Sequence, residues 1–354
     1  MSARGVNRRA CLLGLSALAG IAGLAPIRAQ ALAPGFSGWE IWRSKFLTPE
    51  GRVIDDYQNA ISHSEGQAWG LLFAVAAGDW PAFDAIRGWT NAHLAVRQDP
   101  LLAWRFIPGE PYETRDYNNA SDGDLFYAWA LLRGGRQFSD PEALAQSERI
   151  ARGLMEICVA EDPRQQGRLQ LLPGAEHFRH DGHLTLNPSY IMPRALHELA
   201  AAFDLPILAQ VAEDGAALLE EIAADGLPPD WIGLDGGGWA PADGPKGRFG
   251  YDAIRVPLYL IWSGRAGHPM VRQTARLWSQ AGAGTAVQAG RDGEILHRDP
   301  SPGYAALART VRLATEPEGA LTSVSTQADQ QGYYPATLGL LAELVAHDIG
   351  IPES

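Results

Sequence analysis

The chain alternates apolar runs of helical length with short polar breaks. Beyond residue 31 the apolar positions follow the three- and four-residue spacing of helices, and Pro or Gly stands at most junctions. No long segment alternates residue by residue, as a half-exposed strand does. The pattern therefore predicts an all-α fold of about eleven helices, over residues 38–47, 65–77, 81–97, 122–134, 141–160, 190–203, 206–223, 252–263, 267–282, 302–314 and 335–347.

Short β structure and long loops complete the expected architecture. The only strand candidates are RLQLL (168–172) and HLTL (183–186), which predict a small β-hairpin. The longest Gly-rich segment, GLDGGGWAPADGPKGRFG (233–250), is interpreted as a functional surface loop because helical patterns flank it.

Paired helices without a Ser/Pro-rich linker predict one domain. Such helices form either an α-solenoid or a closed ring of helical hairpins. A solenoid ordinarily shows a tight repeat at a fixed period, and this chain has none. The absence of a repeat favours the ring.

The N-terminus has the three parts of a secretory signal peptide. Basic MSARGVNRRA precedes the apolar segment CLLGLSALAGIAGLAPI, and Ala29-Gln30-Ala31 offers a cleavage site. We therefore expect residues 1–31 to be removed and residues 32–354 to form a single catalytic domain in the periplasm or outside the cell, without membrane insertion. The Arg8-Arg9 pair leaves both twin-arginine and general secretion open.

The net charge limits the classes of binding partner, and the cysteine count excludes an internal disulfide. Cleavage after Ala31 removes four arginines and no acids, which changes the net charge from −12 to −16 with His neutral. Nucleic acid and anionic membranes are therefore poor partners, whereas a neutral or cationic polymer remains open. Cys158 is then the single cysteine, so no internal disulfide forms, and we interpret it as a small buried hydrophobe.

Common catalytic and metal motifs are missing. The chain has no G-x-S-x-G elbow, P-loop, H-E-x-x-H or C-x-x-C motif. His177, His180 and His183 have a spacing that zinc could use, but they fall in the predicted hairpin and are interpreted as a solvated loop. We expect neither a metal nor a cofactor.

Carboxylates at helix starts are the remaining candidates for chemistry. Glu65, Asp122 with Asp124, and Asp252 each open a predicted helix. Acids in a first turn also complement the helix dipole, so a purely structural role competes with a catalytic one.

Two capping registers are possible at the first of these helices. Glu65 closes a capping box that begins at Ser62, or Ser64 caps the helix and Gln67 closes the box. The sequence alone does not decide between them. We expect the second register, because it leaves Glu65 free to act as an acid.

Aromatic residues accompany these carboxylates. The chain contains eleven Trp, and several aromatics precede or follow the acids in the sequence. Aromatic faces stack on sugar rings, and paired carboxylates with aromatics are the equipment of glycoside hydrolysis. A cleft for a polysaccharide is therefore expected, with Trp69, Trp104, Tyr117, Trp129, Trp231 and Trp239 as candidate lining residues.

Four ordered segments resemble glycoside hydrolase family 8: SHSEGQAWGL, NNASDGDLFYAWAL, LNPSY and YDAIRVP; GRVIDD (51–56) also fits. The resemblance implies that Glu65 is the general acid and Asp252 the general base. It also implies that Asp122 contacts the sugar at the cleavage site, that Tyr190 helps to hold the attacking water, and that Arg255 sits beside the base. The expected substrate-binding residues are Trp104, Tyr117, Asp122, Tyr190, Arg255, Tyr333 and Tyr334.

The same resemblance implies an (α/α)6 barrel and an inverting mechanism, closest to the exported endoglucanases that accompany bacterial cellulose synthesis. We therefore expect endo-hydrolysis of a β-1,4-glucan chain by a monomer, with the cellulose synthase export complex as a partner. Xylan, mixed-linkage glucan and chitosan are alternative substrates, and a non-catalytic glucan-binding protein is an alternative of another class. Inversion predicts that the Glu65 and Asp252 carboxyls lie roughly 6.5–9.5 Å apart.

Overall fold

A computed structural model describes residues 36, 38–109, 113–114, 116–315 and 330–351. All of them belong to one compact unit, residues 31–354. The predicted signal peptide, residues 1–31, lies outside the described residues. Within the described part, no helix is both long and apolar enough to cross a membrane.

Eleven α-helices form in the described residues, and each coincides with one of the predicted apolar runs. Differences are confined to the helix ends, where Pro or Gly usually stands. The helices are α1 (Gly38–Phe46), α2 (Ser64–Ala76), α3 (Trp80–His93), α4 (Ser121–Gln137), α5 (Pro141–Ile157), α6 (Pro193–Phe203), α7 (Pro206–Ala224), α8 (Val256–Trp262), α9 (Pro269–Ser279), α10 (Pro302–Thr315) and α11 (Tyr333–Asp348).

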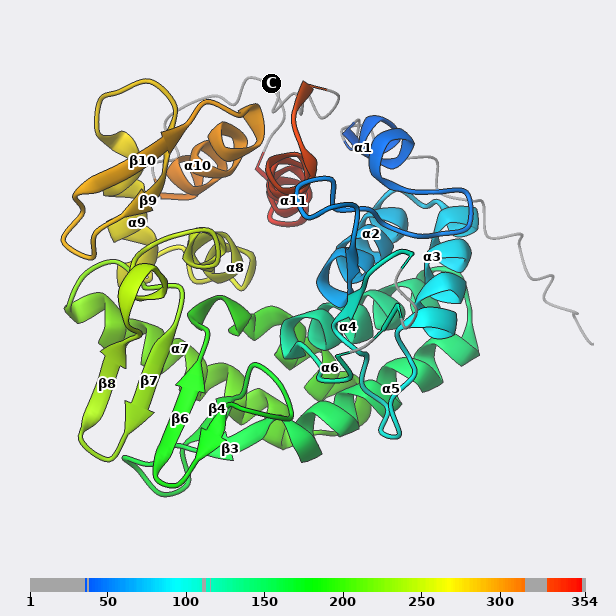
Figure 1. Cartoon of the computed structure of the whole chain (residues 1–354), viewed down its shortest axis with the longest axis horizontal. Coiled ribbons are helices and arrows are strands. Elements are labelled where there is room, and N and C mark those ends of the chain that lie inside the picture. The colour runs from blue at the N-terminus through cyan, green and yellow to red at the C-terminus, as the bar shows by residue number, and fades with distance from the viewer. Residues whose placement is uncertain (1–35, 37, 110–112, 115, 316–329, 352–354) are drawn as a thin grey trace, which may run out of the picture. The chain divides into compact units, whose positions relative to one another are not determined.

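Five helices form a closed inner ring. Helix α2 contacts α4, α4 contacts α6, α6 contacts α8, α8 contacts α11, and α11 returns to α2 (Figure 1). The other six pack against this ring: α3 on α2, α5 on α4, α7 on α6, α9 on α8, and both α1 and α10 on α11. With five inner and six outer helices, the described residues form eleven of the twelve helices of the predicted (α/α)6 barrel.

The distribution of apolar residues explains which helices lie inside. Helices α2 and α11 are apolar on nearly every face, and almost all of their residues are buried. Helices α5 and α9 carry one apolar face only, so they bury that face and expose the other. A helix that is hydrophobic all round must be covered on all sides, which places it in the inner ring.

Short antiparallel sheets decorate the helical unit. One has four strands in the order β5 (Arg179–His180), β6 (His183–Leu186), β7 (Ile232–Asp235) and β8 (Gly238–Pro241). The two-stranded sheets pair β1 (Ser62–His63) with β2 (Arg105–Phe106), β3 (Val159–Glu161) with β4 (Leu169–Leu171), and β9 (Thr285–Ala289) with β10 (Ile295–Asp299).

Two predictions about β structure are wrong. The candidate strands 168–172 and 183–186 both contain strands but do not pair with each other, because β4 pairs with β3 and β6 pairs with β5 and β7. The segment 233–250 is not simply a loop, since β7 and β8 form a hairpin within and just before it. Backbone pairing to distant segments, which periodicity does not report, decides both cases.

Several predicted cleft aromatics belong to the core instead. The Trp69 and Trp129 side chains are fully buried, so they cannot stack on a substrate. Cys158 is buried as predicted, and its Sγ accepts a hydrogen bond from Asn119 at 3.3 Å. Of the three histidines, His180 lies in β5 and His183 in β6, and the exposed His177 precedes both strands.

Candidate active site

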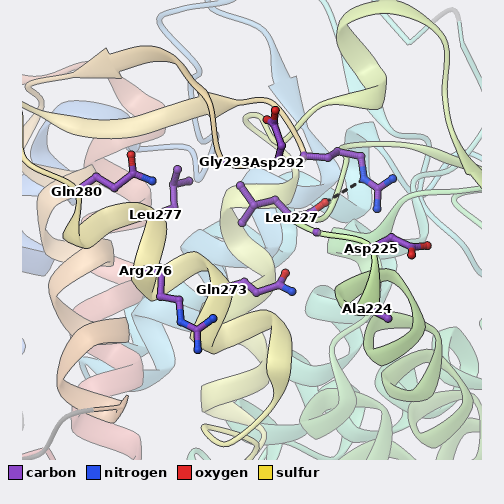
Figure 2. Close-up of a pocket in the computed structure, with 11 residues that line it drawn as sticks. Ala224, Asp225, Leu227, Gln273, Arg276, Leu277, Gln280, Asp292 and Gly293 are labelled. Atoms are coloured by element: carbon purple, nitrogen blue, oxygen red, sulfur yellow. Dashed lines mark hydrogen bonds between the residues drawn. The ribbon is translucent and has the colours of Figure 1, made fainter.

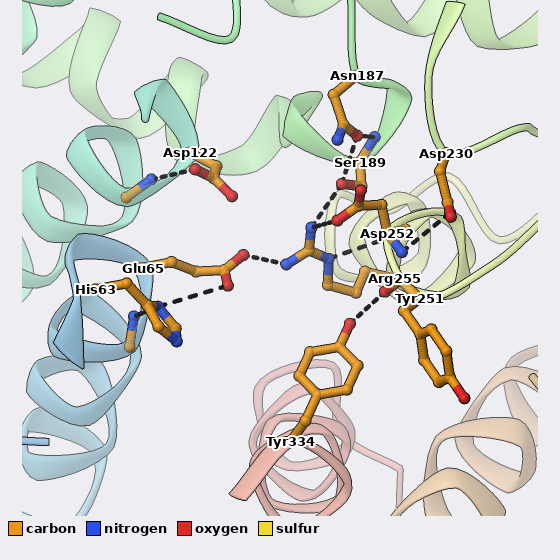
Figure 3. A network of polar contacts seen from close by, with 12 residues as sticks. His63, Glu65, Asp122, Asn187, Ser189, Asp230, Tyr251, Asp252, Arg255 and Tyr334 are labelled. Atoms are coloured by element: carbon orange, nitrogen blue, oxygen red, sulfur yellow. Dashed lines mark hydrogen bonds and ion pairs between the residues drawn. The ribbon is translucent and has the colours of Figure 1, made fainter. Parts of the chain in front are cut away.

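The starts of the inner helices meet at one pocket of about 140 Å³. Its carboxylates come from the first turn of α2, the first turn of α4 and the residue that precedes α8's 3-10 turn (Ala253–Arg255). Figure 3 shows the Glu65 and Asp252 carboxylates joined to Arg255, with Asp122 on the side of Glu65 away from Asp252. The lining residues are Gln58, His63, Ser64, Glu65, Trp104, Ala120, Asp122, Tyr190, Asp252 and Arg255.

Glu65 does not cap α2, as predicted. The predicted capping residues, Ser64 and Gln67, are wrong. The cap is His63, whose Nδ1 accepts the backbone N–H of Gly66 at 2.9 Å. Gln67 is buried and instead accepts the N–H of Val53 at 2.6 Å, and the Ser64 hydroxyl has no hydrogen-bond partner in the described residues. The Glu65 side chain is therefore free to face the pocket, where it is 17% exposed.

His63 is fixed by a second acid. Its Nε2 lies 3.4 Å from Asp55 Oδ2, and Asp55 is buried. Because Nδ1 accepts from Gly66, the ring proton of the neutral form is on Nε2 and points to Asp55. Hydrogen bonding to His63 contributes to a lowered pKa of Asp55, against the effect of its burial. His63 Nδ1 lies 4.0 Å from Glu65 Oε2.

Arg255 joins the two predicted catalytic carboxylates. Its buried guanidinium contacts Glu65 through Nη1 and Asp252 Oδ1 through Nη2, the latter at 3.0 Å. Nη2 also donates to the Ser189 hydroxyl at 2.8 Å. The predicted contact between Arg255 and Asp252 is thus present, whereas its contact with Glu65 was not anticipated.

Asp122 is buried beside Glu65. Its burial, and then the charge and hydrogen bonding of Glu65, hold the pKa of Asp122 well above its usual range, although Arg255 acts in the opposite direction. The neutral form of Asp122 is therefore favoured. A neutral carboxyl can donate a hydrogen bond, which suits a residue that binds a sugar hydroxyl.

Tyr190 completes the group around the carboxylates. It ends the 3-10 turn Pro188–Tyr190 before α6 and lines the pocket. Burial, and then the negative charges of Asp122, Asp252 and Glu65, hold the pKa of the Tyr190 hydroxyl well above its usual range. The hydroxyl therefore keeps its proton and can donate to a water or a sugar.

Three other predicted binding residues differ in their distance from the pocket. Trp104 lines the pocket, and its Nε1 donates to Asp116 Oδ2 at 2.6 Å. Tyr334 lies beside the site, and its hydroxyl donates to the backbone oxygen of Tyr251 (Figure 3). Tyr117 is 57% exposed and does not line the pocket.

The prediction that Tyr333 binds the substrate is wrong. Its side chain is fully buried and packs against Trp42, Phe46 and His63, so it cannot touch a substrate. Successive residues of a helix point about 100° apart, and for this reason Tyr334 faces the site while Tyr333 faces the core.

The sequence reasoning missed four residues that support this pocket: His63, Ser189, Asn187 and Asp230. Asn187 Oδ1 accepts from both the N–H and the hydroxyl of Ser189. Asp230 Oδ1 accepts the backbone N–H groups of Asp252 and Ala253. His63 and Asn187 lie within or beside quoted motifs and were available as signals, whereas Asp230 is 22 residues from its partner and had none.

A larger pocket of about 380 Å³ lies elsewhere, between the end of α7, helix α9 and the turn of the β9–β10 hairpin (Figure 2). Arg291 Nε donates to the backbone oxygen of Leu227 at 3.3 Å at its edge. Its two acids, Asp225 and Asp292, are both exposed. None of the predicted catalytic residues lines it, so the smaller pocket is the candidate active site.

Comparisons with known proteins identify the family of the chain. The family described as "Glycosyl hydrolases family 8" matches residues 15–345. A probable endoglucanase from Novacetimonas hansenii is 36% identical over 314 residues, which cover 86% of this chain and 88% of the relative. An endoglucanase from Cellulomonas uda is 38% identical over 229 residues, 64% of this chain and 63% of that protein.

Solved structures share the fold. Endoglucanase Cel10 from Klebsiella pneumoniae superposes with a TM-score of 0.78 at 33% identity, covering 88% of this chain and 99% of its own. The endo-β-1,4-glucanase CMCax from Acetobacter xylinum gives 0.78 at 32% identity, covering 90% and 100%. Rex8A from Paenibacillus barcinonensis, at 18% identity and a TM-score of 0.66, shows the likeness of fold alone.

Proposed function

The chain belongs to glycosyl hydrolase family 8, and from that premise we propose that it is an inverting endo-β-1,4-glucanase that acts on cellulose chains during bacterial cellulose biosynthesis and export. The observation that carries the proposal is the pair of carboxylates, Glu65 and Asp252, that contact different nitrogens of one buried guanidinium. Glu65 lies in α2 and Asp252 just before the 3-10 turn that leads into α8, and both face the same pocket.

The roles follow from this arrangement. Glu65 donates a proton to the glycosidic oxygen as the bond from that oxygen to the anomeric carbon breaks. Asp252 accepts a proton from the water that attacks the same carbon from the opposite face. Both carboxylates are required because acid and base act in one step, and the product carries the inverted configuration.

Asp122 supplies the surroundings that an acid needs. Burial, and then the neighbouring Glu65, raise the pKa of Asp122 and favour its neutral form, so Asp122 can donate a proton in a hydrogen bond beside the acid. Two neighbouring carboxyls resist simultaneous ionisation, and such a pair retains a proton that one member can donate. Asp122 then binds the distorted sugar, and Tyr190 donates to the attacking water.

A neutral β-1,4-glucan suits the pocket and the chain. The Trp104 ring lines the pocket, where it can stack on a sugar ring, and the net charge of −12 does not repel a neutral polymer. The role in cellulose synthesis rests on the resemblance and on the predicted signal peptide. We propose a monomeric enzyme that acts in the periplasm or outside the cell, beside the cellulose synthase export complex.

Release of reducing ends from carboxymethylcellulose, compared with xylan, mixed-linkage glucan and chitosan, tests the proposal. We expect the fastest release from carboxymethylcellulose, with a rapid fall in viscosity because an endo-acting enzyme cuts within chains. Glu65→Gln serves as the matched blank. Faster release from xylan or chitosan would reassign the substrate, and no release from any polymer would favour a glucan-binding protein.

A further inference from the structure

The Asp252 carboxylate does not cap the 3-10 turn that it precedes. Asp252 stands at the N-cap of the 3-10 turn Ala253–Arg255, yet its side chain accepts no backbone N–H there. An Asp at such a position ordinarily bonds the free N–H groups that follow it. Here the carboxylate points into the pocket and is 35% exposed. Those N–H groups must therefore find another acceptor.

Asp230 provides that acceptor from a distant loop. Its Oδ1 accepts the N–H of Asp252 at 3.0 Å and that of Ala253 at 2.7 Å. Gly250 makes room for the approach, because a Cβ at Gly250 would lie only 2.3 Å from Asp230 Oδ2. Asp230 is itself held, since its own N–H donates to the backbone oxygen of Arg248 at 2.8 Å.

The next residue, Trp231, holds the carboxylate itself. Its Nε1 donates to Asp252 Oδ2 at 3.1 Å, while Arg255 holds Oδ1. The indole stacks on Phe178 with ring centroids 5.8 Å apart and planes 17° apart, and the Lys246 ammonium lies 5.2 Å from its centre. This ring is therefore clamped and serves as a donor at its edge, not as the sugar platform that its position in the sequence suggested.

We infer that Asp230 and Trp231 are positioning residues for the general base: Asp230 fixes the backbone that carries Asp252, and Trp231 fixes the direction of its carboxylate. The inference rests on the proposed function, because it takes Asp252 as the base. A base must point at the attacking water, and a displacement of about 1 Å costs on the order of 10² in rate.

Asp230 positions the backbone through its Oδ1 oxygen, and its negative charge is not needed for this. Burial, and then the nearby Asp252 charge, raise the pKa of Asp230 to about 7, while Arg255 and the two backbone donors oppose the shift. Both its neutral and ionised forms can accept the two N–H groups through Oδ1. Asn therefore reproduces the positioning, whereas Ala removes it.

The test compares Asp230→Ala, Asp230→Asn and Trp231→Phe, with Asp235→Asn as the matched control. Asp235 lies in β7, is exposed and also accepts a backbone N–H, from Gly237 at 2.8 Å, but it does not line the pocket. For each variant we would measure kcat, KM and thermal midpoint on a soluble cello-oligosaccharide, and kcat on an aryl cello-oligoside with a good leaving group.

Asp230→Ala should lower kcat about 10²-fold with KM changed less than about threefold, and Trp231→Phe should lower kcat about tenfold, the loss of one hydrogen bond. Asp230→Asn should recover most of the rate that Asp230→Ala loses, and Asp235→Asn should match the wild type. The losses should persist with the good leaving group, because that substrate dispenses with the acid but still needs the base.

Three outcomes would overturn the inference: wild-type kcat in Asp230→Ala, equal losses in Asp230→Ala and Asp230→Asn at equal thermal midpoints, or recovery of both variants on the activated substrate. If Asp230→Ala fails to fold, Trp231→Phe decides, and an unchanged kcat in that variant overturns the role of Trp231. Failure of the proposed function looks different, because the wild type itself would then release no reducing ends from glucan.

Discussion

At the scale of single residues, each of the two proposed catalytic carboxylates, Glu65 and Asp252, stands at the start of a helical turn, and another residue accepts the backbone N–H groups there. His63 accepts the Gly66 N–H in the first turn of α2, and Asp230 accepts the N–H groups of Asp252 and Ala253. A capping carboxylate is turned back on its own backbone, whereas these two are turned into the pocket. Substitute caps thus reconcile helix formation with catalysis.

Glu65→Gln separates the catalytic role from the structural one. We expect its kcat on an unactivated glucan to fall by about 10²–10⁴ because Gln cannot donate the proton. Its thermal midpoint should stay close to that of the wild type, since His63 caps α2 and the Gln oxygen can still accept from Arg255. Activity assays and thermal melts check this, and full activity with an early melt would return Glu65 to a structural role.

Asp230 also predicts a pH dependence of stability. Because its pKa is raised from 3.8 to about 7 on folding, the folded state binds its proton more tightly than the unfolded state does. The free energy of unfolding therefore falls as pH rises from about 4 to 7, by up to roughly 4 kcal/mol at 1.36 kcal/mol per unit.

Urea unfolding of the wild type and Asp230→Asn from pH 4.5 to 8.5 measures this effect. The variant lacks the titration, so wild-type stability should decline relative to the variant across that range. Parallel curves for the two proteins would show that Asp230 has the same proton affinity in both states.

At the scale of elements, the acid and its carboxyl neighbour depend on how closely α2 and α4 approach. Gly123 lies in the first turn of α4, and a Cβ there would stand 2.2 Å from the Ser64 hydroxyl and 2.8 Å from the Glu65 backbone nitrogen. Only a residue without a Cβ lets the two helix starts meet. This contact places Glu65 beside Asp122.

Gly123→Ala should therefore push the two helix starts apart. We expect a loss of about 1–3 kcal/mol in the free energy of unfolding, as for other overpacked sites, together with a lower kcat. The control is Gly88→Ala in α3, where a Cβ meets nothing within 4 Å; it should be stabilising by about 0.5–1 kcal/mol. Equal stabilities and rates for the two variants would remove the steric argument.

At the scale of the whole molecule, the ring brings together residues that are far apart in sequence. Glu65, Asp122, Tyr190 and Asp252 come from or just before four successive inner helices, and Arg255 ties the first to the last. In the proposed mechanism, the acid from α2 and the base that precedes α8 act from opposite sides of a bound sugar, so their carboxyls must stand apart. That separation leaves room for a water, as inversion requires.

The stereochemistry of the product tests this geometry directly. NMR of the first product released from a β-linked cello-oligosaccharide should show the α-anomer. A structure with bound oligosaccharide should show the Glu65 and Asp252 carboxyls roughly 6.5–9.5 Å apart. A β-anomer, or a separation near 5 Å, would assign a retaining mechanism and make Asp252 a nucleophile.

The sequence by itself determined the helices and most of the residues that meet in the pocket. All eleven apolar runs became helices because a three- to four-residue apolar spacing is a local property that needs no partner to be recognised. The motifs likewise brought Glu65, Asp122, Tyr190, Asp252 and Arg255 to one site, where the structure places them.

Only the tertiary structure decided which residues hold those carboxylates in position. The cap of α2, the support from Asp230 and the pairing of β4 and β6 depend on groups from other parts of the chain or on the direction of a side chain. Tyr333 and Tyr334 differ in the same way, since one turns to the core and the other to the site. Hydrogen bonds and packing between distant segments form only when the chain has folded, so the local pattern carries no record of them.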